Sequence, residues 1–144
     1  MQARKDASIE TIHRELVAFA RRARASAARM HPQLSLVSYT LLAYMSDRPD
    51  CRATDLAEAF LLDKSTVSRQ VAALERLGFV ERRTHPSDQR VQVLLPTAAG
   101  ATVLAEATRA ARRSVRGRLA DWEDADLERF AAYLTRFNDA APPA

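Results

Sequence analysis

A short run of hydroxyl, amide and guanidinium side chains holds the groups of this sequence that are best suited to contact DNA. An arginine can donate two hydrogen bonds to a guanine edge, and a glutamine can pair with adenine in the same bidentate way. Serine and threonine hydroxyls near a helix N-terminus suit contacts to phosphate. The candidate contact residues in this run are Ser65, Thr66, Ser68, Arg69 and Gln70.

A second set of basic residues follows, at Arg82, Arg83 and Arg90, with Asp88 two positions before the last of them. We expect Arg90 to enter a minor groove, where arginine side chains are commonly inserted. A carboxylate facing DNA is repulsive, so we expect Asp88 to orient Arg90 through a charge-assisted hydrogen bond. The plain alternative is that Asp88 and Arg90 only close a hairpin.

Neither catalytic nor metal-binding patterns accompany these residues. The sequence has no glycine-rich phosphate loop and no nucleophile motif, and His13, His31 and His85 lack the spacing of metal ligands. We therefore expect no enzymatic activity, no metal and no cofactor. Cys51 is the single cysteine, so no internal disulfide can form, and no second thiol is present to resolve an oxidised one. We expect a structural role for Cys51 and a reducing, cytoplasmic compartment.

The element that must position the first set is a helix between Asp63 and Gly78. Asp63 stands where an N-cap residue accepts free backbone N–H groups, and Gly78 stands where a left-handed C-cap favours glycine. The two faces of this helix differ. One is apolar, whereas the other carries small, polar and basic side chains and therefore fits a major groove about 12 Å wide. The apolar stripe is Val67, Val71, Leu74 and Leu77. By its angle on the helix, Gln70 lies nearer this stripe than the polar face.

The element that must position the second set is a β-hairpin. Residues 79–84 and 90–95 are strand-like, and the polar residues 85–89 between them predict a turn. Val91, Val93 and Leu95 alternate with Arg90, Gln92 and Leu94, so we expect the first group to face inward. A capped helix followed by a basic hairpin is typical of a winged helix-turn-helix, in which the helix lies in the major groove.

Residues 54–100 resemble the DNA-binding lobe of the MarR family of bacterial regulators. The resemblance is carried by Asp55-Leu56-Ala57, by Ser65-Thr66-Val67-Ser68-Arg69 and by the run from Leu74 to Arg82. It continues through the wing motif Asp88-Gln89-Arg90 and the segment from Leu95 to Gly100 that opens the next helix. One departure is Pro96, which separates Leu95 from Thr97 and removes a backbone donor there.

Amphipathic spacing predicts helices on both sides of this lobe. We expect Ser8, Thr54, Thr97 and Asp121 to cap four of them, and Cys51-Arg52 to form a very short strand beside the wing. We also expect Phe60 to pack against the helix that follows it. The predicted helices are 8–30, 35–47, 55–61, 97–120 and one that starts at Asp121, with a frayed tail at 140–144.

The expected fold is mainly α with a small β-hairpin: a winged helix-turn-helix lobe flanked by N- and C-terminal dimerisation helices. The end helices carry wide apolar faces, which favour burial against a second copy of the chain. The alternative is that they pack on each other in a monomer. We expect one MarR-type domain over residues 1–144, with the lobe at 34–96, a connecting helix at 97–120 and dimerisation helices at 1–33 and 121–144.

The resemblance implies a triangular homodimer with a small-molecule effector site between the dimerisation helices and the lobe. Candidate pocket residues are His13, Leu16, Tyr39, Leu42 and Met45. Each of these side chains also fits an ordinary place in a hydrophobic core.

Composition agrees with a DNA-binding protein without requiring one. Of the 144 residues, 47% are hydrophobic and the formal net charge is +4, which permits nucleic-acid binding. No run is long and apolar enough to cross a bilayer, and the first residues lack the apolar core of a signal peptide. We expect a homodimeric transcriptional repressor that binds double-stranded DNA at a pseudo-palindromic operator. A winged-helix module that binds protein is the alternative, and a small enzyme is a poorer one.

Overall fold

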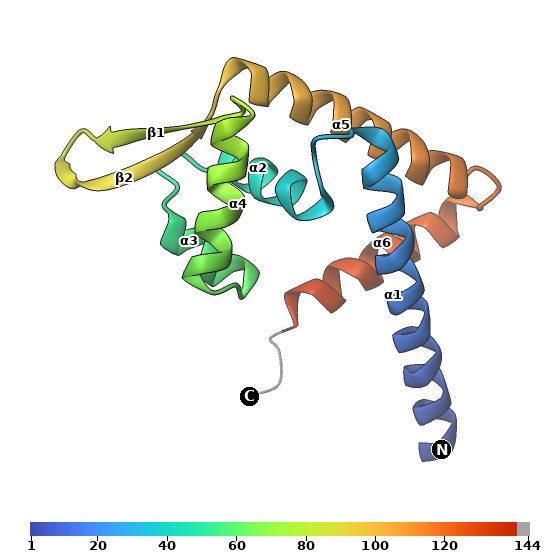
Figure 1. The fold of residues 1–144 in the computed structure, drawn as a ribbon. Helices are drawn as coiled ribbons and strands as arrows, with labels where there is room; N and C mark the ends of the chain where they lie inside the picture. Colours follow the sequence, from blue (N-terminus) through green and yellow to red (C-terminus); the bar gives the residue numbers. More distant parts are fainter. Residues whose placement is uncertain (141–144) are drawn as a thin grey trace. The chain divides into compact units, whose positions relative to one another are not determined.

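The computed structural model describes residues 1–140 and has two compact units, which meet within one helix between Thr108 and Arg109. Helices and one hairpin follow each other in the predicted order, which confirms the expected fold class (Figure 1). The elements are α1 Gln2–Met30, α2 Leu36–Asp47, α3 Ala53–Phe60, α4 Lys64–Arg76, β1 Val80–His85, β2 Asp88–Pro96, α5 Ala98–Arg118 and α6 Asp124–Asp139.

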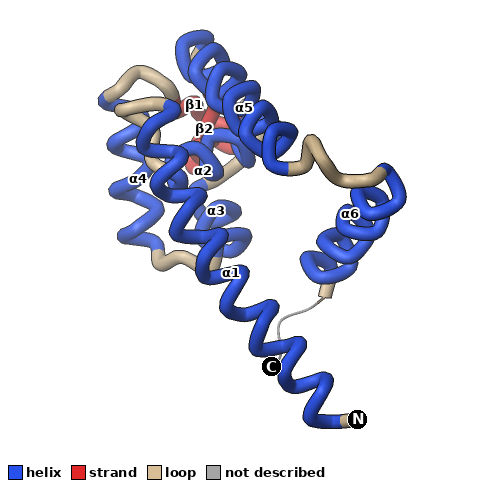
Figure 2. The backbone as a smooth tube through the Cα atoms, turned by 90° about the vertical axis from the view of Figure 1, so that its right-hand side faces the viewer, coloured by secondary structure: helices blue, strands red, loops and turns tan. Residues whose placement is uncertain are grey.

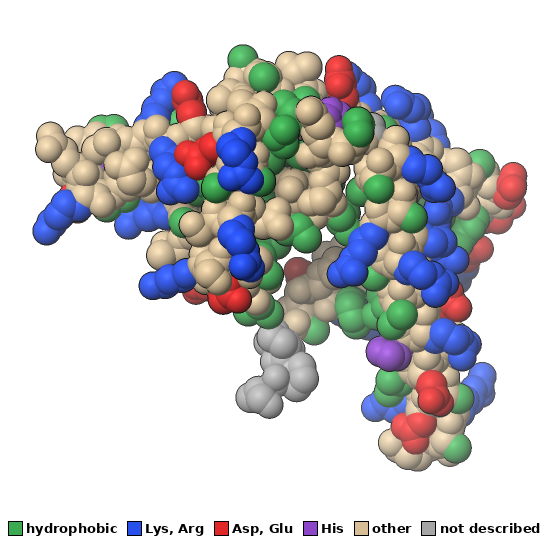
Figure 3. All heavy atoms as spheres, in the orientation of Figure 1, with side chains coloured by type: hydrophobic (Ala, Val, Ile, Leu, Met, Phe, Trp, Pro, Cys, Tyr) green, Lys and Arg blue, Asp and Glu red, His purple; other side chains and the backbone are tan. Residues whose placement is uncertain are grey.

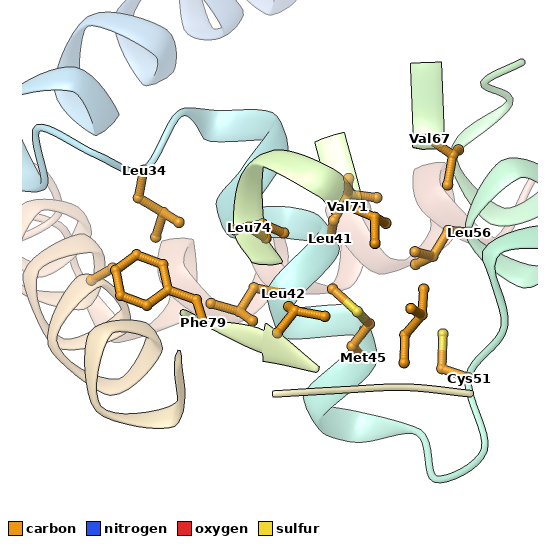
Figure 4. Close-up of a cluster of buried hydrophobic side chains, with 13 residues drawn as sticks. Leu34, Leu41, Leu42, Met45, Cys51, Leu56, Val67, Val71, Leu74 and Phe79 are labelled. Carbon is orange, nitrogen blue, oxygen red and sulfur yellow. The ribbon is translucent and has the colours of Figure 1, made fainter. Parts of the chain in front are cut away.

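The core of the first unit lies where α2, α3, α4 and the hairpin meet. Side chains from α2 and α4 point toward one another there, and Cys51 lies at the edge of the cluster beside β2 (Figure 4). Leu41, Leu42, Leu56 and Leu74 are fully buried. Burying a leucine side chain contributes about 1.5–3 kcal/mol, so this cluster is what holds the lobe together. The remaining members are Leu34, Met45, Cys51, Val67, Val71, Phe79, Val80, Leu94 and Ala107.

Local hydrogen bonds set the starts of α2 and α3. Ser35 Oγ accepts from the Ser38 N–H at 3.1 Å and caps α2. The Asp55 carboxylate accepts from the Arg52 N–H at 2.8 Å, so α3 begins at Ala53. The prediction that Thr54 caps this helix was therefore wrong, because Asp55 satisfies the free donor from inside the first turn.

The aromatic residue at the end of α3 packs against α2. The Phe60 ring lies 5.5 Å from that of Tyr44 in an edge-to-face arrangement, and the Arg48 guanidinium stacks over Tyr44 at 3.7 Å. Phe60 also packs against the core cluster, to which α4 contributes Val67, Val71 and Leu74. The next residue, Leu61, adopts a left-handed conformation with φ of 50° and is 86% exposed. The tight turn between the two helices therefore forms without the glycine that such a conformation favours.

The hairpin is antiparallel and pairs Val80 with Pro96 and Arg82 with Leu94. Its turn is narrower than predicted, because the strands reach His85 and Asp88. Val91 and Val93 are more buried than Arg90 and Gln92, as predicted. The prediction was wrong for Leu94, which is 1% exposed, whereas Leu95 is only half-buried. Leu94 lies on the same face of the hairpin as Val80 and Arg82, the face directed toward the core. Val93 lies on the other face and is also buried. The Leu94 N–H donates to the Cys51 carbonyl at 2.7 Å, which replaces the short strand expected there.

A glycine lets α5 start directly against the end of α4. A Cβ atom placed on Gly100 would lie 2.0 Å from the carbonyl oxygen of Phe79, so only glycine fits. Thr97 Oγ1 accepts from the Gly100 N–H at 3.1 Å and donates to the Gly78 carbonyl at 2.5 Å. The predicted Thr97 cap is confirmed, and its side chain also links the end of α4 to the start of α5. The backbone of the described residues is mostly helical (Figure 2).

The outer helices begin at other residues than predicted. Helix α1 starts at Gln2, and the Ser8 hydroxyl donates to the Arg4 carbonyl within it, so Ser8 is not a cap. Helix α6 starts at Asp124 with Glu123 as its N-cap residue, so Asp121 is not one either. The predicted fraying of 140–144 concerns, apart from Ala140, residues outside those described. None of the described helices combines the length and apolar character of a membrane span.

Candidate nucleic-acid interface

Both ends of α4 are closed by the residues that the sequence predicts. The Asp63 carboxylate accepts from the Thr66 N–H at 2.6 Å and from the Ser65 hydroxyl at 2.8 Å. The first of these hydrogen bonds, followed by the second, lowers the pKa of Asp63 from 3.8 to about 2. At the other end Gly78 has φ of 75°, and the Phe79 N–H donates to the Leu74 carbonyl at 2.9 Å. This is a Schellman motif, and it turns the chain sharply into the hairpin.

A row of exposed residues runs along the outer face of α4. Ser65, Arg69 and Arg76 are exposed, and the half-buried Ala72 lies between them, opposite the buried stripe of Val67, Val71 and Leu74. Of the predicted stripe only Leu77 is on the surface. Arg76 was not among the predicted contacts, although its spacing of seven from Arg69 places both guanidinium groups on one face. Small side chains between them allow close approach to a groove.

The N-terminus of α4 is less suited to phosphate than predicted. Asp63 already holds the Thr66 N–H and the Ser65 hydroxyl hydrogen, and its negative charge repels a phosphate placed there. Ser65 therefore presents an acceptor oxygen rather than a donor. Thr66 Oγ1 accepts from an Arg69 guanidinium nitrogen at 3.3 Å, which holds Arg69 against the helix. Ser68 is exposed beside this row.

Gln70 lies on the inner side of the helix. Its Oε1 accepts from the Ser38 hydroxyl of α2 at 3.2 Å, and the Ser35 hydroxyl donates to Ser38 at 2.9 Å. Reading adenine requires the amide oxygen and nitrogen together. Because its oxygen already has a partner within the lobe, Gln70 is not arranged to read adenine, in keeping with its predicted position near the apolar stripe.

The tip of the hairpin carries a nearly free arginine. The Arg90 side chain is 92% exposed, and its Nε donates to Asp88 Oδ1 at 3.3 Å. The same carboxylate oxygen accepts from the Arg90 N–H at 3.0 Å. The pair is therefore formed in the free protein, as the orienting role of Asp88 requires. On the strand before it, Arg83 forms an ion pair with Glu81 at 2.5 Å.

Arg82 is directed toward α4. Its Nε donates to Glu75 Oε1 at 2.9 Å; the Arg82 side chain is 39% exposed and that of Glu75 30%. Arg82 thus lies on the core-facing side of β1, and Arg83 on the opposite side. In the view of Figure 3, Lys and Arg side chains lie over α4 and along the hairpin, with acidic side chains beside some of them.

The predicted effector residues do not share one environment. Leu42 and Met45 are buried in the core of the lobe, so a ligand cannot contact them without displacing their neighbours. His13 and Leu16 are exposed on α1. Tyr39 is half-buried, and its hydroxyl lies 3.2 Å from Thr108 Oγ1, which joins α2 to the first half of α5. Of the five candidates, Leu42 and Met45 are corrected to core residues.

Cys51 is buried, and this burial raises the pKa of its thiol to about 11, with a smaller contribution from Asp55. A thiol held in the protonated form is a poor nucleophile. Within residues 1–140, no three side chains among His, Cys, Asp and Glu are grouped closely enough to hold a metal ion.

Comparison with known proteins links this geometry to one family. The family model for MarR matches residues 34–91, which span the lobe from the start of α2 to the wing. The chain is 34% identical over 134 residues to YxaD, an HTH-type transcriptional regulator of Bacillus subtilis (strain 168). That alignment covers 92% of this chain and 94% of YxaD.

Solved structures share the fold. A MarR family protein from Bacillus stearothermophilus superimposes with a TM-score of 0.81 at 20% identity, over 96% of each chain. The crystal structure of MarR gives 0.78 at 23% identity, over 89% of this chain and 95% of that one. Bordetella bronchiseptica BpsR, whose DNA binding is regulated by 6-hydroxynicotinic acid, gives 0.73 at 19% identity, over 90% and 94%.

Proposed function

Because the chain belongs to the MarR family of transcriptional regulators, we propose that it is a repressor that binds a pseudo-palindromic operator as a homodimer. Members of this family are DNA-binding transcription factors and not enzymes, and this holds for the present chain. The observation that carries the finer proposal is the outer face of α4. Arg69 and Arg76 are exposed on this face, seven residues apart, so both can reach one groove. The hairpin that follows α4 carries Arg90 near its tip, where the side chain extends into solvent.

We assign the major-groove contacts to Ser65, Ser68, Arg69 and Arg76, and the minor-groove contact to Arg90. Arg69 and Arg76 are exposed, and each can pair with a guanine edge. Arg83 lies on the outer side of β1 and can reach the phosphate backbone. Thr66 holds Arg69 against the helix by accepting a hydrogen bond from its guanidinium group. Asp88 fixes the direction of Arg90, so that the carboxylate itself is turned away from phosphate.

A homodimer is supported by apolar side chains that each unit leaves exposed. On α1 these are Ile9, Ile12, Leu16 and Phe19, and α6 has no buried residue at all. Burial contributes about 25 cal/mol per Å², so a second copy of the chain is the natural partner of these faces. A two-fold dimer then places two α4 helices about 34 Å apart, in consecutive major grooves. Occupying an operator in this way blocks transcription in the cytoplasm, where the chromosome lies.

We also propose that a small-molecule effector releases the protein from its operator. BpsR responds to 6-hydroxynicotinic acid, and the Tyr39–Thr108 contact ties the lobe to α5. An effector can act only by binding the DNA-incompetent arrangement of the two lobes better than the competent one. Among the candidate pocket residues, we favour Tyr39, because its side chain is half-buried and its hydroxyl contacts Thr108 of α5.

The test begins with selection of bound duplexes from a random pool. We expect an inverted repeat to be enriched and its affinity to fall by about 10³–10⁵ between 50 and 200 mM salt, as for a dimer that neutralises about 6–10 phosphates. Arg90→Ala should weaken binding by at least about tenfold, while Arg90→Lys separates the charge from the guanidinium geometry. Arg14→Ala on α1 is the control for removal of one positive charge. A flat salt response without an enriched sequence would leave a protein-binding module instead.

A further inference from the structure

We propose that Gln70 and Arg82 are positioning residues, which fix the rotation of α4 about its axis and thereby determine which base pairs its outer row reads. The inference rests on the proposed function. It reassigns two side chains that the sequence analysis placed on DNA to contacts inside the lobe. It also assigns roles to Ser38 and Glu75, their partners.

The hydrophobic stripe of α4 alone defines its rotation poorly. Val67, Val71 and Leu74 form a narrow seam, and apolar contacts have no preferred direction. The neighbouring Ala72 and Ala73 have too little side chain to resist turning. Polar contacts with defined geometry are therefore needed if the outer row is to stand at a fixed angle.

Two such contacts flank the stripe on opposite sides. At 3.6 residues per turn, Gln70 lies about 70° to one side of the centre of the stripe, and Glu75 about 70° to the other. Gln70 meets Ser38 of α2, and Glu75 meets Arg82 of β1. Turning α4 in either direction lengthens at least one of the two hydrogen bonds.

Both partners are anchored in rigid surroundings. Ser38 is 7% exposed and lies in the first turn of α2, where the capping residue Ser35 holds both its N–H and its hydroxyl. Arg82 projects from the face of β1 that also carries Val80, and its cross-strand partner is the buried Leu94. The first contact ties α4 to the core, and the second ties it to the wing.

A small rotation is enough to matter for recognition. A helix with its side chains has a radius of about 5–6 Å, so a turn of about 20° moves a side-chain tip by about 2 Å. Hydrogen bonds to base edges tolerate only a few tenths of an ångström around 2.9 Å. Contacts to phosphates, made by flexible arginines, adjust more easily. Loosening the two contacts should therefore reduce discrimination between sequences more than total affinity.

The experiment compares the ratio of non-operator to operator Kd for Ser38→Ala and Glu75→Gln, using full-length protein. We expect each ratio to fall about tenfold, which corresponds to about 1.4 kcal/mol. The slope of log affinity against log salt should stay unchanged, because no phosphate contact is lost. Ser114→Ala and Glu106→Gln remove the same groups from exposed positions of α5 and should leave the ratio as it is.

Arg82 provides the sharpest distinction. If it bound a phosphate, Arg82→Ala would lower the salt slope by about 1, and Glu75→Gln would strengthen binding by removing a negative charge. Either result would overturn the inference. Positioning predicts instead that Glu75→Arg and Arg82→Glu each reduce the ratio and that the double exchange restores it. Thermal unfolding of every variant identifies any that is merely unfolded, and the double exchange supplies a folded comparison.

Measurements on the wild-type protein distinguish failure of the proposed function from failure of this inference alone. A wild type without any preferred sequence would overturn the proposed function together with this inference. A wild type with a clear operator whose ratio is unaffected by Ser38→Ala and Glu75→Gln would overturn the inference alone.

Discussion

At the scale of single residues, Asp63 serves folding at the expense of DNA binding. Its carboxylate holds the first turn of α4, but it also places a negative charge at the end of a helix that we propose to face DNA. Asparagine is an equally good capping residue without the charge. The helix cap and the interface therefore make opposite demands on this side chain.

We predict that Asp63→Asn raises operator affinity while leaving the melting temperature at pH 7 nearly unchanged. The pKa of Asp63 is lowered in the folded protein, from 3.8 to about 2, so its contribution to stability is present above pH 3.8 and is lost as the pH falls toward 2. Melting temperatures followed by circular dichroism should show this acid loss in the wild type and less of it in Asp63→Asn. Asp63→Ala, which has no cap, should melt lower at pH 7; equal melting of both variants would contradict the capping role.

Cys51 is a buried packing residue whose chemistry is suppressed. Its pKa of about 11 keeps the thiol protonated at neutral pH, and its carbonyl accepts from Leu94 at the root of the wing. This agrees with the structural role that the sequence analysis expected. A sensor cysteine would instead be exposed and have a lowered pKa.

We predict that Cys51 reacts with a chromogenic disulfide reagent at least about a hundredfold more slowly in the native protein than in denaturant. Because its pKa is raised on folding, stability should be lost as the pH rises from 9 toward 11, and Cys51→Ala should lose less in that range. Rapid reaction of the native protein at pH 7 would argue for a redox role.

At the scale of elements, the joint between α4, β1 and α5 depends on two glycines with different reasons. Gly78 supplies the left-handed residue of a Schellman motif. Gly100 supplies space, because its Cα lies against the Phe79 carbonyl. The start of α5 is thereby fixed to the end of α4, and Thr97 strengthens this joint through its hydrogen bond to Gly78.

We predict that Gly100→Ala destabilises the protein by about 1–3 kcal/mol, the usual cost of forcing a methyl group into a packed site. Gly117→Ala is the matched control, since a Cβ atom there meets nothing within 4 Å. That substitution should stabilise by about 0.5–1 kcal/mol, because alanine favours the helix. Urea unfolding of the two variants measures both, and equal effects would contradict the close contact at Gly100.

At the scale of the whole molecule, the apolar residues left exposed argue that a single chain is incomplete. Phe130, Tyr133, Leu134 and Phe137 of α6 are all between 41% and 57% exposed. Aromatic side chains dominate the energetics of interfaces when buried. The proposed homodimer gives these side chains a partner and gives the DNA-binding lobes their spacing.

We predict that Phe130→Asp combined with Ile12→Asp yields a monomer at about micromolar concentration in sedimentation experiments, because a charge buried without a partner is costly. Operator affinity should fall by at least about 10², since a single lobe keeps only half of the contacts. Leu61→Asp, also an exposed apolar position but far from either face in sequence, is the control and should remain dimeric. A dimeric double variant would mean that other surfaces hold the copies together.

The sequence by itself determined the elements and their order, because capping residues, helical spacing and strand alternation act locally. Asp63, Gly78 and Thr97 are all found in the roles that they were predicted to have. Starts were missed where a neighbour satisfied the backbone donor instead, as Asp55 does for α3. The Asp88–Arg90 pair was also predictable, since its members are two residues apart.

Only the tertiary structure decided where side chains on the flanks of α4 point. Gln70 and Arg82 have the chemistry of DNA contacts, and their partners Ser38 and Glu75 lie 32 and 7 residues away. Nothing local reveals such pairs, because they form when α2 and β1 close around the helix. The same holds for Leu42 and Met45, which are buried in the core of the lobe. It also holds for Gly100, which lies against the backbone carbonyl of Phe79. Local patterns fix what a segment becomes, whereas long-range packing fixes which of its groups remain free to act.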